Sequence, residues 1–120
     1  MLTSRMPEGT LSNDFMEYFN REEDTDVIIN TEPEIHAHSQ ILCARSEYFR
    51  IALSNTWAKR NDSGSFIIQC KEKHVVMHAI IMYLYSGTIN LTGLEFEMVL
   101  ELLLESEKLM LNTLSLIIYC

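Results

Sequence analysis

Apolar residues recur at helical spacing near the start of the chain. Four of them occupy positions i, i+4, i+7 and i+8: Leu11, Phe15, Tyr18 and Phe19. This spacing places the four side chains on one face of a helix, with polar residues on the other face. Residues 1–9 show no such pattern. We therefore predict a flexible lead-in over residues 1–9 and a helix that begins at Thr10.

Three β-rich segments follow. The segments "DVIIN" at residues 26–30 and "IHAH" at residues 35–38 are separated by "TEPE", which contains Pro33. Such a pair around a turn predicts a β-hairpin. A third strand is predicted for "SFIIQC" at residues 65–70.

The remaining patterns are helical. Two short helices are predicted to begin near Ser39 and Ser46, since serine caps helix N-termini well. A longer amphipathic pattern covers residues 72–86, and Gly87 is placed to end it.

Two more helices are predicted towards the C-terminus. Thr92 and Glu95 have the spacing of a capping box, which would begin the first of them. Its predicted inward residues are Phe96, Val99, Leu100, Leu103 and Leu104. The second begins at residue 112 and continues to Cys120. Helices thus outnumber strands, and the pattern predicts an α+β fold.

Composition and charge narrow the possible functions. A chain of 120 residues with 48% hydrophobic and 22% charged residues is expected to form one domain, here residues 10–120. Its formal net charge of −8 opposes binding to nucleic acid and suits contacts with other proteins. We expect no signal peptide, no membrane span and reduced cysteines, which indicates a cytoplasmic or nuclear protein.

The four histidines offer a possible metal site. His36 and His38 would share one face of a strand, and His74 and His78 would share one face of a helix. The His-Glu-x-x-His arrangement of zinc hydrolases is missing. We favour a structural His38 that packs and hydrogen-bonds at the strand-to-helix corner, with the other three on the surface. A small metal-binding protein remains the alternative, and no metal or cofactor is expected.

A catalytic site is not favoured either. Asp26, His38 and Ser39 are the residue types of a hydrolase triad. However, two of them are sequence neighbours, and no Gly-rich elbow supplies an oxyanion hole. We therefore expect no enzymatic activity.

An ordered set of residues across the chain resembles the BTB/POZ domain family. The set includes the Asp-Val pair, the apolar-x-Ala-His segment, Arg-Ser-x-Tyr-Phe and Tyr-x-Tyr-x-Gly. Its members are Asp26, Val27, Ala37, His38, Leu42, Ala44, Arg45, Ser46, Tyr48, Phe49, Tyr83, Tyr85 and Gly87. The resemblance implies a helical cluster flanking a small, mostly three-stranded sheet. It also implies a non-catalytic protein–protein interaction module that commonly homodimerises.

The resemblance further implies a dimer interface. The first helix would pack on the first core helix of a second copy, so the implied contact residues are Leu11, Phe15, Tyr18, Phe19, Ile41 and Leu42. The alternative is that this helix folds back on its own domain. In the implied groove at the dimer seam, Ser39 stands where the family often has Lys or Arg, so Asp26 lacks its usual cation. Ser39 could itself donate a hydrogen bond to Asp26.

The resemblance also raises the possibility of a substrate adaptor for a cullin-type ubiquitin ligase. Cullin-binding members carry a hydrophobic-x-Glu signature, and the nearest match here is Trp57-Ala58-Lys59, followed by Arg60. Lys59 reverses the expected charge. Trp57 could alternatively cover the edge of the domain's own core.

The C-terminal part of the chain has two further features. Glu97, Glu101 and Glu105 recur at every fourth position, which predicts a solvated face or a contact for a basic segment. The final "LSLIIYC" carries no charge, so we expect it either to pack on the preceding helix or to continue into a longer protein. A kelch, BACK or TLDc region could follow in such a protein.

Overall fold

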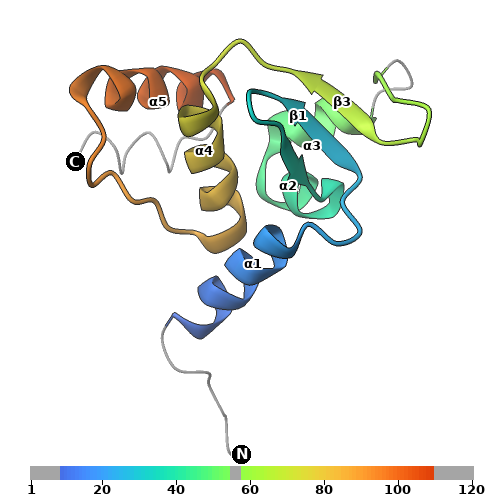
Figure 1. Ribbon diagram of the computed structural model, residues 1–120, viewed down its shortest axis with the longest axis horizontal. Helices are drawn as coiled ribbons and strands as arrows, with labels where there is room; N and C mark the ends of the chain where they lie inside the picture. The colour runs from blue at the N-terminus through green and yellow to red at the C-terminus, as the bar shows by residue number, and fades with distance from the viewer. Residues whose placement is uncertain (1–8, 55–57, 110–120) are drawn as a thin grey trace, which may run out of the picture.

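The computed structural model describes residues 9–54 and 58–109 (Figure 1). In chain order the elements are α1 (Thr10–Arg21), β1 (Val27–Asn30), β2 (Ile35–Ala37), α2 (Ser39–Arg45), α3 (Glu47–Ser54), β3 (Phe66–Gln69), α4 (His74–Ser86) and α5 (Phe96–Lys108). The predicted α+β class is confirmed. The helix predicted from residue 112 lies outside the described residues.

The three strands form one small mixed sheet in the order β2-β1-β3. Strands β1 and β2 form the predicted antiparallel hairpin, with Val27 opposite Ala37. Strand β3 pairs with β1 in parallel, with Val27 beside Phe66. Alternate residues of β1 are fully buried, because Val27 and Ile29 face the helices while Asn30 faces solvent.

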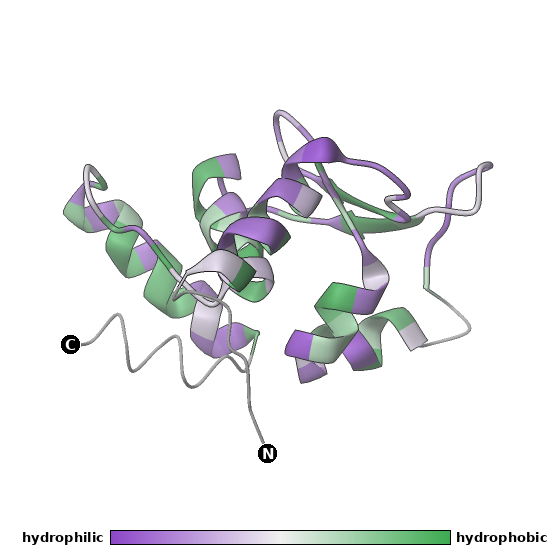
Figure 2. Cartoon of the chain, turned by 90° about the horizontal axis from the view of Figure 1, so that it is seen from below, coloured by the Kyte–Doolittle hydropathy of each residue, from purple (hydrophilic) through white to green (hydrophobic). Residues whose placement is uncertain are grey.

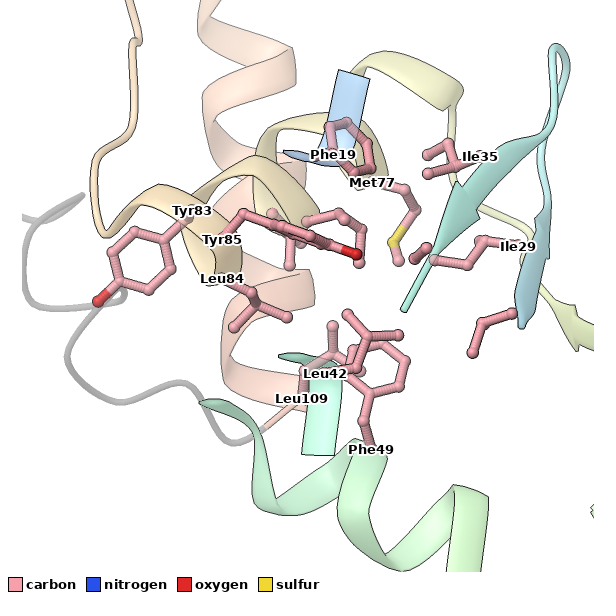
Figure 3. Close-up of a cluster of buried hydrophobic side chains, with 14 of the residues drawn as sticks. Phe19, Ile29, Ile35, Leu42, Phe49, Met77, Tyr83, Leu84, Tyr85 and Leu109 are labelled. Atoms are coloured by element: carbon pink, nitrogen blue, oxygen red, sulfur yellow. The ribbon is translucent and has the colours of Figure 1, made fainter. Parts of the chain in front are cut away.

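Helix α4 is the centre of the core (Figure 3). Helices α1, α2 and α5 and strand β2 all pack against it. Its buried side chains include Val76, Met77, Ile80, Ile81 and Leu84. Each large apolar side chain that is fully buried contributes roughly 1.5–3 kcal/mol. This continuous apolar helix therefore supplies much of the driving force that holds the other elements in place.

Two of the predicted helix ends are confirmed and one is wrong. Gly87 ends α4 with a left-handed φ of 75°, and its N–H donates to the carbonyl of Tyr83. The hydroxyl of Ser46 accepts the N–H of Phe49 at the start of α3. The capping box before α5 does not form, because α5 begins at Phe96 with Glu95 as its N-cap residue, so Thr92 lies outside the start of the helix.

The predicted inward face of α5 is wrong at three of its five positions, while Val99 and Leu103 are half-buried. The side chains that α5 buries are Leu102, Glu105 and Ser106. Three of the predicted inward residues are exposed instead, namely Phe96, Leu100 and Leu104. Apolar residues surround most of this helix, so spacing alone cannot select its buried face. The fully buried Ser106 gives that face a small side chain, which allows close packing.

Glu105 is the least expected buried residue. Its side chain is 6% exposed, although the sequence suggested a solvated face. It lines a pocket of about 330 Å³ together with Tyr48, Cys70 and Glu72. Burial raises the pKa of Glu105, nearby Lys108 opposes the rise, and the charge and hydrogen bond of Glu72 add to it. Glu105 therefore binds its proton more tightly in the folded protein than in the unfolded chain.

This burial predicts a pH-dependent effect of Glu105→Gln. Because the folded-state pKa is raised, the stabilisation by the protonated form is complete below the unfolded value of 4.5 and is lost as pH rises through the folded value. Each unit of pKa elevation corresponds to about 1.4 kcal/mol. Glutamine cannot ionise, so the variant should become progressively more stable than wild type as the pH rises above 4.5 and through the raised pKa of Glu105 in the folded protein.

Urea denaturation across this pH range measures the difference. Glu97→Gln is the control, because Glu97 is an exposed residue of the same helix. Its stability should follow that of wild type at every pH. Parallel pH profiles for wild type and Glu105→Gln would contradict the assignment.

Candidate functional site

His38 occupies the corner between β2 and α2, where it is 3% exposed. Its backbone N–H donates to the Tyr85 hydroxyl oxygen at 2.7 Å. The Tyr85 O–H donates to Nδ1 of His38 at 2.6 Å, and Nε2–H of His38 donates to the carbonyl of Glu23 at 2.7 Å. This set of partners assigns the Nε2–H tautomer. The predicted structural role of His38 is confirmed.

Tyr85 is the buried partner on α4. Burial raises the pKa of its hydroxyl far above the usual value, although the hydrogen bond from the His38 backbone opposes the rise. Tyr85 therefore remains a neutral donor at physiological pH. Its hydroxyl points into the core, whereas that of Tyr83 points away from the cluster (Figure 3).

Helix α1 rests on this hydrogen-bonded pair. The ring of Tyr18 stacks on His38 with centroids 4.0 Å apart, and the ring of Phe19 lies 4.8 Å from that of Tyr85. Nearer the N-terminus of α1, the Ser12 hydroxyl donates to the carbonyl of Ser86 at 2.6 Å. Contacts at both halves of α1 thus fix the helix along α4.

Asp26 and Ser39 contact each other as the sequence suggested. The N–H of Ser39 donates to Oδ1 of Asp26 at 2.7 Å, and its hydroxyl donates to Oδ2. Two hydrogen bonds thus take the place of the cation that the family often provides. The arrangement does not form a hydrolase triad, because both ring nitrogens of His38 are bonded elsewhere.

An apolar groove lies between α1 and α2. It has a volume of about 340 Å³ and is lined by Leu11, Phe15, Ile41, Ala44 and Leu84, among others. Leu11 is 56% exposed, whereas Phe15 and Ile41 are half-buried. These three predicted interface residues are therefore brought together at an accessible surface. Tyr18 is also half-buried, but its ring is stacked on His38.

Two predicted interface residues lie in the core instead. Phe19 is 5% exposed and Leu42 is fully buried. The C-terminal half of α1 packs on α4, so the side chain of Phe19 is buried between the two helices. Leu42 points from α2 into the same core. Assigning them to a contact with a second copy is wrong for this conformation. The alternative, a helix folded on its own domain, holds for this half of α1.

The structure describes two of the three residues predicted to contact a cullin, Lys59 and Arg60. Trp57 lies outside the described residues. Lys59 and Arg60 are exposed, and both are tied to β3. The carbonyl of Lys59 accepts the N–H of Ile67, while the guanidinium of Arg60 lies 4.0 Å from the centroid of the Phe66 ring. This cation–π contact was not foreseen from the sequence.

The four histidines do not meet at one site. His36, His74 and His78 line one pocket, and the rings of His74 and His78 stack with centroids 5.3 Å apart, but His38 is not part of that lining. His38 has no free ring nitrogen, so the four-histidine metal site is wrong. The other three are half-buried rather than freely exposed. His36 lies 3.6 Å from Glu34, while Nδ1–H of His74 donates to the carbonyl of Pro33 at 2.8 Å. Within residues 9–54 and 58–109, no three His, Cys, Asp or Glu side chains are arranged to hold a metal ion.

Comparison with known proteins agrees with this geometry. The family model for the BTB/POZ domain matches residues 15–118. The chain belongs to the BTB/POZ family. BTB domains generally serve as protein–protein interaction modules. Among the helices of the described part of this BTB domain, none is long and apolar enough to cross a membrane.

Solved structures show the same fold. The BTB domain of human gigaxonin superposes with a TM-score of 0.71 at 22% identity, covering 98% of this chain and 94% of that one. The BTB domain of zebrafish PATZ1 gives a TM-score of 0.69 at 18% identity, covering 98% and 95%. Comparison with curated proteins finds no match. The BTB fold is thus shared while most of the sequence differs.

The hydrogen bonds of Tyr85 predict that Tyr85→Phe destabilises this BTB domain by about 1–3 kcal/mol. The change leaves a buried N–H and a buried ring nitrogen of His38 without their partner. Tyr83→Phe is the matched control on the same helix, since the Tyr83 hydroxyl points out of the core.

Urea denaturation at neutral pH measures both variants. We expect the Tyr83 variant to lie within about 0.5 kcal/mol of wild type. Equal losses in the two variants would contradict the role assigned to the Tyr85 hydroxyl.

Proposed function

We propose that this BTB domain is a non-catalytic module that homodimerises through the groove between α1 and α2 and recruits other proteins. The groove is the observation that carries the proposal. Leu11 is 56% exposed at its edge, and the groove beside it is largely apolar. Dimerisation is typical of the family.

A symmetric pairing explains how one groove serves both copies. In a two-fold dimer the same surface contacts its counterpart, so α1 of one copy can cover Ile41 of the other and the reverse. Leu11 and Phe15 lie one helical turn apart and would enter the partner's groove together. Contacts of α1 and α2 would form the centre of an interface of standard size, ~1,600 Å².

The anchoring of α1 favours this association. Ser12 and Tyr18 hold the helix on its own subunit before a partner arrives. A preorganised surface loses less conformational entropy on binding than a mobile one. The network around His38 thereby contributes to the interface without touching the partner.

Other parts of the proposal concern location and chemistry. Cys43 and Cys70 are free thiols, which supports a cytoplasmic or nuclear protein. No direct contact with nucleic acid is proposed, because the net charge of −8 repels phosphate. Neither a cofactor nor catalysis is part of the proposed role.

Light scattering on a size-exclusion column tests the dimer at tens of micromolar protein. Wild type should have twice the 13.9 kDa mass of one chain. Leu11→Glu introduces a charge at the groove edge and should shift the protein to monomer, because burying an unpaired charge is costly. Ile51→Glu is the matched control, since Ile51 on α3 is 58% exposed and lies outside the groove.

Circular dichroism verifies that both variants are folded. A monomeric wild type would contradict the proposal. So would equal dissociation by Leu11→Glu and Ile51→Glu.

The cullin-adaptor alternative has less support. Lys59 is exposed, but it has the opposite charge to the glutamate of the family signature. If a cullin N-terminal domain binds here, Lys59→Glu should strengthen capture in a pull-down by about tenfold, because it restores the signature charge. Lys71→Glu, an exposed lysine elsewhere on the domain, is the control. Failure of both wild type and Lys59→Glu to capture the cullin domain would exclude the alternative.

A further inference from the structure

The rings of His74 and His78 stack on each other along α4. Their centroids are 5.3 Å apart and their planes differ by 30°. The two residues are four positions apart in the chain, which places them on the same face of the helix. Both are half-buried. Green residues predominate in α4 in Figure 2, so the two histidines interrupt a mostly apolar helix.

This pair lies where α1 and the β1–β2 hairpin meet α4. The ring of Phe19 on α1 is 5% exposed, and its centroid lies 5.6 Å from that of His78. His74 contacts the hairpin instead, because its Nδ1–H donates to the carbonyl of Pro33 in the turn. The two contacts hold the C-terminal half of α1 and the hairpin against α4. We call His74 and His78 the histidine clasp.

The clasp accepts one positive charge more easily than two. Each imidazole gains a charge on protonation, and two charges at the separation of these rings repel each other. Burial lowers the pKa of His78, and the neighbouring His74 lowers it further. A charged His78 would also need water at the place where the ring of Phe19 now packs.

The other charged groups around the clasp do not remove this penalty. Three titratable residues share its pocket, namely Glu22 from α1 and Glu34 and His36 from the hairpin. Both glutamates are exposed, so solvent screens their attraction for a charged imidazole. Lys73 directly precedes α4, and its positive charge adds to the penalty. His78 also lines a second pocket, whose other described lining residues carry no charge.

We propose that the histidine clasp is an acid-sensitive device, in which protonation of both rings releases the C-terminal half of α1 and the hairpin from α4. The pKa of His78 in the folded protein lies below the ordinary value of 6.5, so the released form binds its proton first as the pH falls. The stability that the neutral ring provides is therefore complete above pH 6.5. It is lost as the pH falls from 6.5 through the lowered pKa of His78.

Release of α1 would also loosen the surface that carries Leu11. Association through the α1 groove should therefore weaken in acid, a consequence that rests on the proposed dimer. The clasp itself needs no second copy, because its contacts with Phe19 and Pro33 lie within one chain.

Proton NMR titration of the histidine rings tests the clasp in the full chain. His78 should titrate below 6.5 in wild type. His74→Gln removes the neighbouring charge but keeps an N–H donor for the carbonyl of Pro33. The pKa of His78 should then rise towards 6.5 without reaching it, because burial remains. His36→Gln is the matched control, since it removes the third histidine of the pocket and leaves the stack, so it should not move the pKa of His78.

Hydrogen exchange measures the release of α1. Since His78→Gln cannot take up a proton, residues 16–22 and 31–36 should lose more protection in wild type than in the variant when the pH falls from about 7.5 to about 5.5. The ratio of wild-type to variant exchange rates should rise by about threefold or more. Both proteins contain Glu105, so its opposite pH effect cancels in this ratio. The same measurements on Leu11→Glu separate the clasp from dimer formation.

Three results would overturn the inference. One is a pKa of His78 at or above 6.5 in wild type, which requires no variant to fold. Another is a pKa of His78 that does not rise in His74→Gln. The third is a ratio of exchange rates that does not change with pH. If wild type proves monomeric but Leu11→Glu and wild type both show the expected shifts, the clasp is supported and only the proposed dimer fails.

Discussion

The pair of hydrogen bonds between His38 and Tyr85 joins parts of the chain that lie 47 residues apart. A corner between a strand and a helix leaves backbone donors without partners inside either element. Tyr85 satisfies one of them from α4, and its neutral hydroxyl also fixes the orientation of the His38 ring. That ring then forms the surface on which Tyr18 stacks. This buried polar contact therefore links the sheet, α2, α4 and α1, which the apolar core around α4 holds together.

The way in which α1 is anchored explains why this one helix can contribute both to stability and to binding. The C-terminal half of α1 gives Phe19 to the core, while its N-terminal half leaves Leu11 at the surface. A partner that covers Leu11 therefore meets a helix already held in place. Helix α5 divides its apolar residues differently, with Leu102 inward and Phe96, Leu100 and Leu104 outward. Both helices thus carry more apolar surface than their own core uses.

Local patterns predicted the local structure well. The hairpin, the third strand, the glycine end of α4 and the structural role of His38 all follow from short-range spacing or from the ordered family residues. The hydrogen bond from Ser39 to Asp26 was also foreseen, because a half-buried carboxylate needs a donor. These features require knowledge of only a few neighbouring residues.

Features that depend on long-range packing were not predictable from the sequence. The buried face of α5 is selected by α4, and apolar residues on several sides of α5 conceal the choice. Glu105 is buried beside Glu72, a residue 33 positions earlier in the chain, so its spacing suggested solvent. Large apolar residues such as Phe19 and Leu42 occur both in cores and in interfaces. Only the packing of α1 and α2 shows that these two belong to the core.

Hydrogen–deuterium exchange at two protein concentrations tests the central claim, that the α1 groove is covered by a second copy, most directly. Between about 1 and 100 μM, the amides of residues 11–15 and of α2 should become more protected, because association buries them. Those of residues 96–104 should not change with concentration. Protection of α1 and α2 that is identical at both concentrations, together with a single mass of 13.9 kDa, would contradict the account.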